Sequence, residues 1–271
     1  MQLRVGFDMT LECTQPTPMI LTLHVHDTRV PDLVRADHLT FDPPVPVTDY
    51  RDGFGNRCSR IVAPPGALRI SADAVVDDSG RADVIADHAK QLPVPDLPEE
   101  TLVFLLGSRY CDTDLLSQTA WDLFGDGPTG WALVQSICDY VHDHITFDYQ
   151  CASSTRTARG AFDERVGVCR DYAHLAIAFC RAMNVPARYC NGYLADIGTA
   201  SSDPRDFHAW LEAFLGGQWY VFDPRNKTPR IGRVLIARGR DAADVAMVNS
   251  FGSILLTEFV VRSEEVAEAA G

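Results

Sequence analysis

Several signals that would assign a protein to a large functional class at once are missing from this sequence. No apolar run approaches the roughly 20 residues that a membrane-spanning helix requires. The glycine-rich phosphate loop of nucleotide hydrolases and the dinucleotide fingerprint of dehydrogenases are absent as well. The first residues alternate between polar and apolar types, unlike a signal peptide. We therefore expect a cytoplasmic protein that needs no membrane and no cofactor.

Positive charge is scarce, because 24 Lys and Arg residues face 37 Asp and Glu residues, for a net charge of -13 at pH 7. An acidic chain of this kind lacks the broad basic surface that nucleic acids require, so we expect no nucleic acid partner. One stretch, residues 225–240, is locally basic. It is interpreted as a solvated loop and strand, with a subsite for an acidic substrate as the alternative.

Cysteine is plentiful, but its spacing contains no Cys-x-x-Cys pair. Small buried thiols in a reducing compartment explain the spacing better than a disulfide framework does. The eight thiols are Cys13, Cys58, Cys111, Cys138, Cys151, Cys169, Cys180 and Cys190.

The first hundred residues indicate a small β-sandwich. Residues 3–12 and 19–26 read as two strands joined in a hairpin, and residues 52–56 form a turn between strands at 45–50 and 58–62. A further strand covers residues 68–76. Three prolines between residues 93 and 98 indicate an extended connector. We place the boundary there, with a β-rich domain at 1–98 and a second domain at 99–271.

The second domain is predicted to be α+β, because helices precede strands along the chain. Asp112 or Thr113 is expected to cap a helix that starts near residue 114. Apolar periodicity predicts helices over 132–144 and 169–183, the second stopped before Pro186. Strands are expected at residues 187–194, 207–214, 218–222, 233–237 and 254–262.

Cys169 stands at the predicted start of a helix. Unpaired N–H groups and the helix dipole at such a position favour a thiolate, which is the reactive form of cysteine. The preceding Gly167 permits a tight backbone entry, and the N–H of Cys169 is suited to face a developing oxyanion. The alternative is a buried structural cysteine.

His208 and Asp223 lie on two strands separated by Gly216-Gly217. If these glycines form a two-residue hairpin loop, position 208 faces 225 and position 223 faces 210. The two side chains are then diagonal neighbours on one face, with backbones about 7–8 Å apart. A one-residue slip would separate them, and each residue alone is also explained as a core histidine or a turn aspartate. With Cys169 they form the constellation that thiol acyl chemistry needs.

Several blocks of the chain resemble the bacterial transglutaminase-like superfamily over about residues 101–262. The blocks are Leu105-Leu106-Gly107-Ser108-Arg109-Tyr110-Cys111, Gly167-Val168-Cys169-Arg170-Asp171-Tyr172-Ala173-His174, Val185-Pro186-Ala187-Arg188-Tyr189, Gly192-Tyr193, His208-Ala209-Trp210 and Trp219-Tyr220-Val221-Phe222-Asp223-Pro224. Relatives often have proline where this chain has Gly107, and the β-rich first part resembles their leader domain.

The resemblance implies a papain-like core, with Cys169 as nucleophile, His208 as base and acid, and Asp223 as the residue that orients the imidazole. It leaves the reaction open, because the superfamily includes cysteine proteases, amidases, transglutaminases and inactive members. We expect hydrolysis of an amide or peptide bond in a peptide or protein substrate. Acyl transfer to an amine and a non-catalytic peptide-binding module with a vestigial triad are the alternatives. No acidic calcium loop is visible.

Other residues are candidates for metal ligands or for lining the site. Cys138 and His142, four residues apart on a predicted helix, suit a zinc pair, although Cys138 also fits the apolar stripe. His24 and His26 share a strand face without a third ligand nearby, so we expect no metal there. His174 lies on the wrong side of the helix to act as the base. Candidates for lining the site or donating to an oxyanion are Tyr110, Trp131 and Tyr149.

Overall fold

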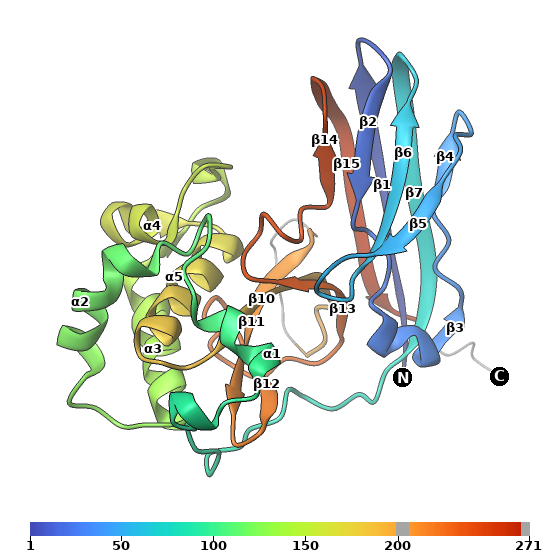
Figure 1. Ribbon diagram of the computed structural model, residues 1–271. Helices are drawn as coiled ribbons and strands as arrows, with labels where there is room; N and C mark the ends of the chain where they lie inside the picture. Colours follow the sequence, from blue (N-terminus) through green and yellow to red (C-terminus); the bar gives the residue numbers. More distant parts are fainter. Residues whose placement is uncertain (199–205, 267–271) are drawn as a thin grey trace.

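The computed structural model describes residues 1–198 and 206–266, which form a β-sandwich beside a part built from helices and a four-stranded sheet (Figure 1). This arrangement confirms the predicted α+β class with a preceding sandwich. The sheets of the sandwich have the orders β15-β1-β7-β3, with β4 also on β7, and β14-β2-β6-β5. Their bounds are β1 (Gln2–Cys13), β2 (Thr17–Leu21), β3 (Leu33–Arg35), β4 (Thr40–Asp42), β5 (Thr48–Arg51), β6 (Arg57–Ala63), β7 (Gly66–Asp77), β14 (Val248–Ser250) and β15 (Ile254–Glu265).

The pairing of the first two strands differs from the predicted hairpin. β1 pairs with β7 and β15, whereas β2 pairs with β6 and β14, so the chain crosses from one sheet to the other between them. Alternation defines which face of a strand is buried, but it does not identify the partner strand. The predicted turn at residues 52–56 is confirmed, because β5 and β6 pair around it.

The last strands of the chain return to the sandwich. β14 and β15 lie in the range 99–271 that we expected to form the second domain, yet they pair with β2 and β1. The range 99–271 therefore includes two strands that belong to the sheets of the sandwich. The boundary near residue 98 itself stays a prediction.

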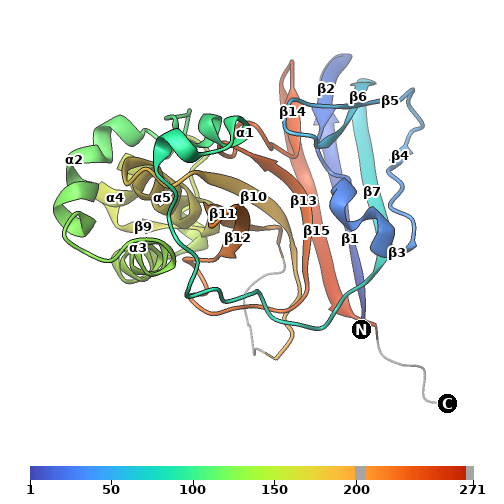
Figure 2. The same ribbon diagram turned by 60° about the horizontal axis from the view of Figure 1, so that its bottom comes forward.

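The second part has an antiparallel sheet of order β12-β11-β10-β13, with α5 packed on β10 and β11 and surrounded by α2, α3 and α4 (Figures 1 and 2). Its main elements are α1 (Glu99–Leu102), α2 (Thr113–Phe124), α3 (Trp131–His144), α4 (Ala158–Glu164), α5 (Cys169–Ala182), β10 (Ala187–Leu194), β11 (His208–Leu215), β12 (Gln218–Phe222) and β13 (Arg233–Gly239). A short parallel pair, β8 (Thr146–Phe147) and β9 (Val166–Gly167), leads into α5. None of the helices in the described residues has the length and apolar character needed to cross a bilayer.

The predicted helices and strands of this part are confirmed within one to three residues at their ends, and one detail is corrected. Asp112 precedes α2 but makes no side-chain cap; its carboxylate accepts the N–H of Arg159 at 3.0 Å, near the start of α4. The seven-residue α4 was not predicted, because two turns hold too few apolar positions to show a period.

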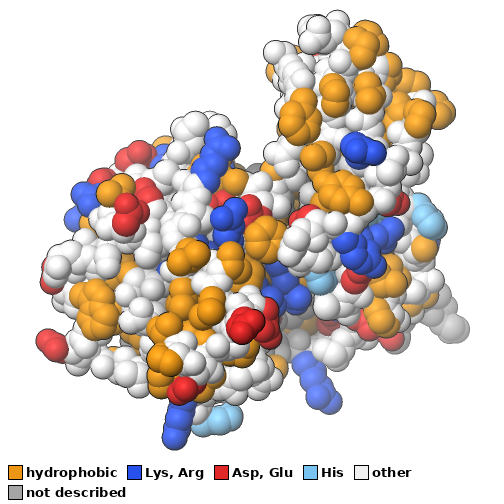
Figure 3. Space-filling model, in the orientation of Figure 1, with side chains coloured by type: hydrophobic (Ala, Val, Ile, Leu, Met, Phe, Trp, Pro, Cys, Tyr) orange, Lys and Arg blue, Asp and Glu red, His pale blue; other side chains and the backbone are white. Residues whose placement is uncertain are grey.

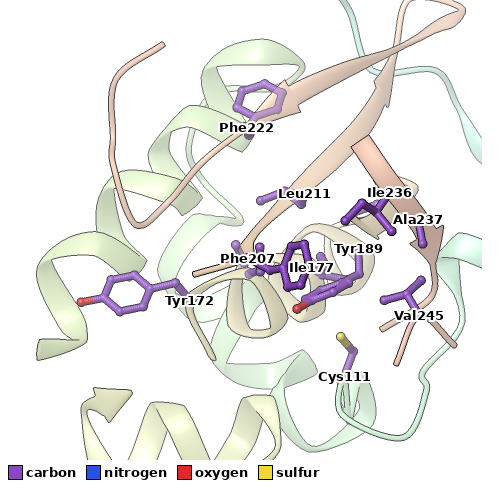
Figure 4. Packing of buried hydrophobic residues seen from close by; sticks show 14 of the residues in the cluster. Cys111, Tyr172, Ile177, Tyr189, Phe207, Leu211, Phe222, Ile236, Ala237 and Val245 are labelled. Atoms are coloured by element: carbon purple, nitrogen blue, oxygen red, sulfur yellow. The ribbon is translucent and has the colours of Figure 1, made fainter. Parts of the chain in front are cut away.

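A continuous core joins the two parts. Figure 4 shows Ile177 of α5 beside Tyr189 of β10, within the buried cluster. Toward the sandwich, the ring of Phe207 lies 6.0 Å from Phe7 of β1 and 5.8 Å from Phe259 of β15, between ring centres. The residue just before His208 is therefore anchored in the sandwich.

Gly192 occupies a position in β10 where no side chain fits. It pairs with His208, and a Cβ built on it would lie 2.2 Å from the carbonyl oxygen of Val234. We expect Gly192→Ala to lower the free energy of unfolding by about 1–3 kcal/mol, measured by urea denaturation, because β13 must move away. Gly53→Ala is the control, since nothing lies within 4 Å of its Cβ. Equal effects of the two substitutions would contradict this account.

Candidate active site

Cys169 is the first residue of α5, and a buried carboxylate fixes this helix start. Oδ2 of Asp171 accepts the N–H of Val168 at 2.9 Å, and Arg156 donates to the same oxygen at 3.2 Å. Burial raises the pKa of Asp171, although these hydrogen bonds and the charges of Arg170 and Arg156 oppose the rise. The thiol itself stays partly exposed at the end of the helix. The predicted helix-start position of Cys169 is thus confirmed.

Gly167 is required for a reason other than the predicted one. Its φ lies outside the left-handed region, so backbone freedom does not explain it. A Cβ at this position would lie 2.6 Å from Oδ2 of Asp171. Glycine therefore makes room for the carboxylate that holds the start of α5.

His208 and Asp223 meet across the hairpin of β11 and β12. Gly216 and Gly217 take φ values of 58° and 93° in the two-residue loop, and the strands pair from Leu215↔Gln218 to Leu211↔Phe222. This is the predicted register. Nε2 of His208 lies 2.9 Å from Oδ2 of Asp223, so the ring can donate to the carboxylate.

The thiol of Cys169 lies close enough to the same imidazole to influence its pKa. Burial disfavours a charged ring, but the charge and hydrogen bond of Asp223, together with those of Cys169, outweigh it and raise the pKa of His208 from 6.5 to about 9. Because Nε2 is engaged by Asp223, Nδ1 is the nitrogen left to face sulfur. The structure thus brings together three residues that are far apart in sequence.

Asp223 is held by more donors than the sequence indicated. Arg233 donates to Oδ2 at 2.6 Å and the amide of Asn226 at 2.8 Å, while the N–H groups of Arg225 and Asn226 bind Oδ1 at 3.1 and 3.0 Å. Burial alone would raise the pKa of Asp223, but His208, Arg233 and Asn226 together keep it well below its usual range. The carboxylate therefore stays charged beside the imidazole.

The basic stretch at residues 225–240 is only partly a solvated segment. Arg230 and Arg233 are each 8% exposed, so the interpretation of this region as a solvated loop and strand is corrected for them. Arg233 also lies over the ring of Trp210, 5.1 Å from its centre, and that ring stacks on His208 at 6.5 Å and 16°. A solvated arginine and a buried ion-pair arginine look alike in a sequence.

A second carboxylate reaches Arg233 from the segment that follows β7. Nε of Arg233 donates to both oxygens of Asp83, at 3.1 and 2.9 Å. Asp83 also pairs through its backbone N–H and its side chain with the backbone of Arg230, both at 2.9 Å. No sequence signal singled out Asp83, because it is one acidic residue in a connector rich in polar residues.

Of the aromatic candidates, Tyr110 lines a cavity beside the start of α5, whereas Trp131 and Tyr149 are not among its lining residues. Trp131 packs in the core against Phe222, 4.5 Å between ring centres. The hydroxyl of Tyr110 donates to the carbonyl of Ser154 at 2.9 Å, and its ring stacks on His174. The ring of Tyr149 packs against Phe147. His174 is fully buried, and burial keeps its pKa well below the usual value, in agreement with a packing role.

The candidate metal ligands are engaged elsewhere. Cys138 is buried in the core, and Nδ1 of His142 bonds the carbonyl of Pro224 at 3.0 Å, next to Asp223. His24 bonds Ser59 and His26 bonds Thr28. Within residues 1–198 and 206–266, no group of three histidine, cysteine or acidic residues is placed to hold a metal ion.

A cavity of about 430 Å³ opens between the start of α5 and the sandwich. Arg170, which follows Cys169 in the sequence, and Tyr110 line it on one side, and Met9 and Phe259 line it on the other. Figure 3 shows a recess between the two parts in this region. The cavity is large enough for an amino acid side chain and its flanking backbone.

Comparison with known proteins links this geometry to a family. Residues 120–224, which include all three site residues, match the model of the transglutaminase-like superfamily. A provisionally assigned cysteine protease from Cytophaga hutchinsonii is 31% identical, with a TM-score of 0.86 over 100% of this chain and 92% of that chain. An uncharacterised protein of Mycobacterium tuberculosis is 28% identical over 233 residues, 78% of this chain and 74% of its own. One from Mycobacterium leprae is 38% identical over 84 residues, and the match covers only 30% of its length.

The raised pKa of His208 makes stability depend on pH. The folded state holds this proton up to a pH of about 9, whereas the unfolded state loses it near 6.5. The proton on His208 therefore stabilises the folded state fully below pH 6.5. This stabilisation, up to about 3 kcal/mol of unfolding free energy, is lost as the pH rises through about 9. We expect urea unfolding to show this loss for the native chain and not for His208→Gln. An identical pH dependence in both would contradict the assignment.

Proposed function

Because the chain belongs to the transglutaminase-like superfamily, we propose that it is a thiol enzyme in which Cys169, His208 and Asp223 act as a triad on amide or peptide bonds. The observation that carries this proposal is the imidazole of His208, which is bonded to a charged aspartate through Nε2 and interacts with the thiol. This arrangement suits an imidazole that exchanges a proton with sulfur and with the leaving group.

The first half of the reaction forms an acyl-enzyme. The thiol of Cys169 gives its proton to His208, and the resulting thiolate attacks the substrate carbonyl carbon. The carbonyl electron pair moves onto oxygen, near the N–H groups at the start of α5. When the oxyanion collapses, the carbon–nitrogen bond breaks and His208 gives its proton to the departing amine. The product is a thioester, and the imidazole is left neutral.

The second half regenerates the thiol. Neutral His208 takes a proton from water as the water attacks the thioester, and the sulfur leaves as the carboxylic acid forms. We favour water over an amine because the ring of His208 remains 15% exposed and the sequence marks no amine site. The provisional assignment of the Cytophaga hutchinsonii relative as a cysteine protease supports the same choice. The cavity beside Arg170 is the proposed seat of the peptide.

Selective reactivity of Cys169 is the first expected outcome. Iodoacetamide should alkylate Cys169 at least about tenfold faster than Cys151 at neutral pH, measured by mass spectrometry of peptides. Cys151 is the matched control because it is also partly exposed, while its hydrogen bond to Asp148 raises its pKa. His208→Gln should reduce the difference. Comparable rates at both thiols in the native chain would count against the triad.

The fate of the acyl group distinguishes hydrolysis from transfer. Peptides incubated with the protein in ¹⁸O-water that contains a fluorescent primary amine should carry the heavy isotope in a new carboxyl group. They should incorporate little of the fluorescent amine. Cys169→Ala should abolish both products, because the chemistry needs sulfur. Amine incorporation without isotope would identify an acyl transferase instead. Labelling of Cys169 by thiol-reactive peptides without any turnover would favour a binding module.

A further inference from the structure

Arg233 is bonded on both sides by carboxylates, one buried and one partly exposed. It is the first residue of β13. Its guanidinium donates through Nη2 to Asp223 at 2.6 Å and through Nε to Asp83 at 2.9 Å. Its side chain is 8% exposed, and the side chains of Asp83 and Asp223 are 14% and 3% exposed. Asp83 comes from the segment between the sandwich and α1, far from the other site residues in sequence.

We propose that Arg233 and Asp83 form a positioning pair for the triad, in which Arg233 fixes the carboxylate of Asp223 and Asp83 balances the charge of the arginine. This inference rests on the proposed function. Neither residue contacts the thiol in the described contacts, so both act through Asp223.

The hydrogen bonds of Asp223 support the positioning role of Arg233. His208, Arg233 and Asn226 share Oδ2, while two backbone N–H groups hold Oδ1. A carboxylate bonded on both oxygens does not rotate freely, so Oδ2 stays aimed at the imidazole. An imidazole held in one orientation keeps its other nitrogen toward the thiol.

Asp83 supplies the electrostatic half of the pair. Arg233 and the imidazole of His208 use the same oxygen, so an unbalanced arginine charge would oppose the charged form of the ring. With Asp83 bonded to Nε, part of that charge is compensated from the other side. The negative charge of Asp223 then remains available to the imidazolium.

Removal of the two partners therefore shifts the imidazole in opposite directions. Asp83→Asn keeps the shape but exposes His208 to the full charge of Arg233, so the pKa of the ring should fall by about one unit. Arg233→Gln removes the competing cation, so the pKa of the ring should rise by a similar amount. The other charged groups near the ring are the Cys169 thiol and Asp206, two residues earlier on the chain, and neither is altered.

A purely structural role makes a different prediction. The same connector is also tied down by Asp78, which accepts from Arg29 at 3.0 Å and lacks any bond to Asp223 in the described residues. Asp78→Asn should loosen the connector without changing the field at the imidazole. It is the matched control, and its ring pKa should stay within a few tenths of the native value.

The experiment is an NMR titration of the His208 ring in the full chain, with the signal assigned by His208→Gln. A second readout is the rate at which iodoacetate, an anion that needs the charged imidazole, alkylates Cys169. Arg233→Gln should slow alkylation at neutral pH at least about fivefold, because Asp223 then no longer holds the ring toward the thiol. Asp83→Asn should instead move the alkaline fall of the alkylation rate about one pH unit lower, since its ring stays charged at neutral pH, and Asp78→Asn should change neither. If Arg233→Gln does not fold, the double variant that carries Asp83→Asn as well preserves the local net charge. The double variant should keep the ring pKa near the native value while alkylation stays slow.

Two outcomes would overturn the positioning role. In the first, Asp83→Asn and Arg233→Gln leave the ring pKa and the alkylation rate at native values. In the second, both variants change the ring pKa in the same direction and by the same amount as Asp78→Asn does. Failure of the proposed function looks different, because Cys169 of the native chain would then react no faster than Cys151 whatever the state of Arg233.

Discussion

The hydrogen bond between His208 and Asp223 is the interaction on which the site depends. It joins two strands whose register is set by Gly216 and Gly217, so a slip of one residue would turn one side chain to the opposite face. Both groups lie largely out of water, where a single charge is costly and a pair of opposite charges is favourable. The same bond selects the ring nitrogen that faces Cys169. Geometry, charge and chemistry at this site therefore share one origin.

The sandwich contributes to this site through packing and through charge. Phe207 places its ring between Phe7 and Phe259, so the strand that begins with His208 is anchored in the core that joins the two parts. The connector that leaves β7 passes Arg233 and brings Asp83 to it. β15 then returns along β1 and closes the chain into one assembly. A hairpin alone would hold His208 and Asp223 without these supports.

The sequence predicts features that depend on neighbours along the chain. The start of α5 at Cys169 and the register of the Gly216-Gly217 hairpin both follow from local turn and helix signals, so His208 and Asp223 could be paired in advance. The partners of β1 lie some 50 to 260 positions away in the sequence, and no local pattern encodes them. The roles of Arg233 and Asp83 were missed for the same reason, since 150 residues separate them.

The buried Arg233 places a positive charge beside Asp223 in a chain that is acidic overall. The net charge of the chain is -13, and negative charge by itself opposes an ionised Asp223. Arg233 pairs with Asp223 on one side and with Asp83 on the other, so its charge is opposed from both sides. The alternation of charges from Asp83 through Arg233 and Asp223 to His208 leaves each member beside an opposite sign. Charge order, more than total charge, determines which protonation state the imidazole holds at neutral pH.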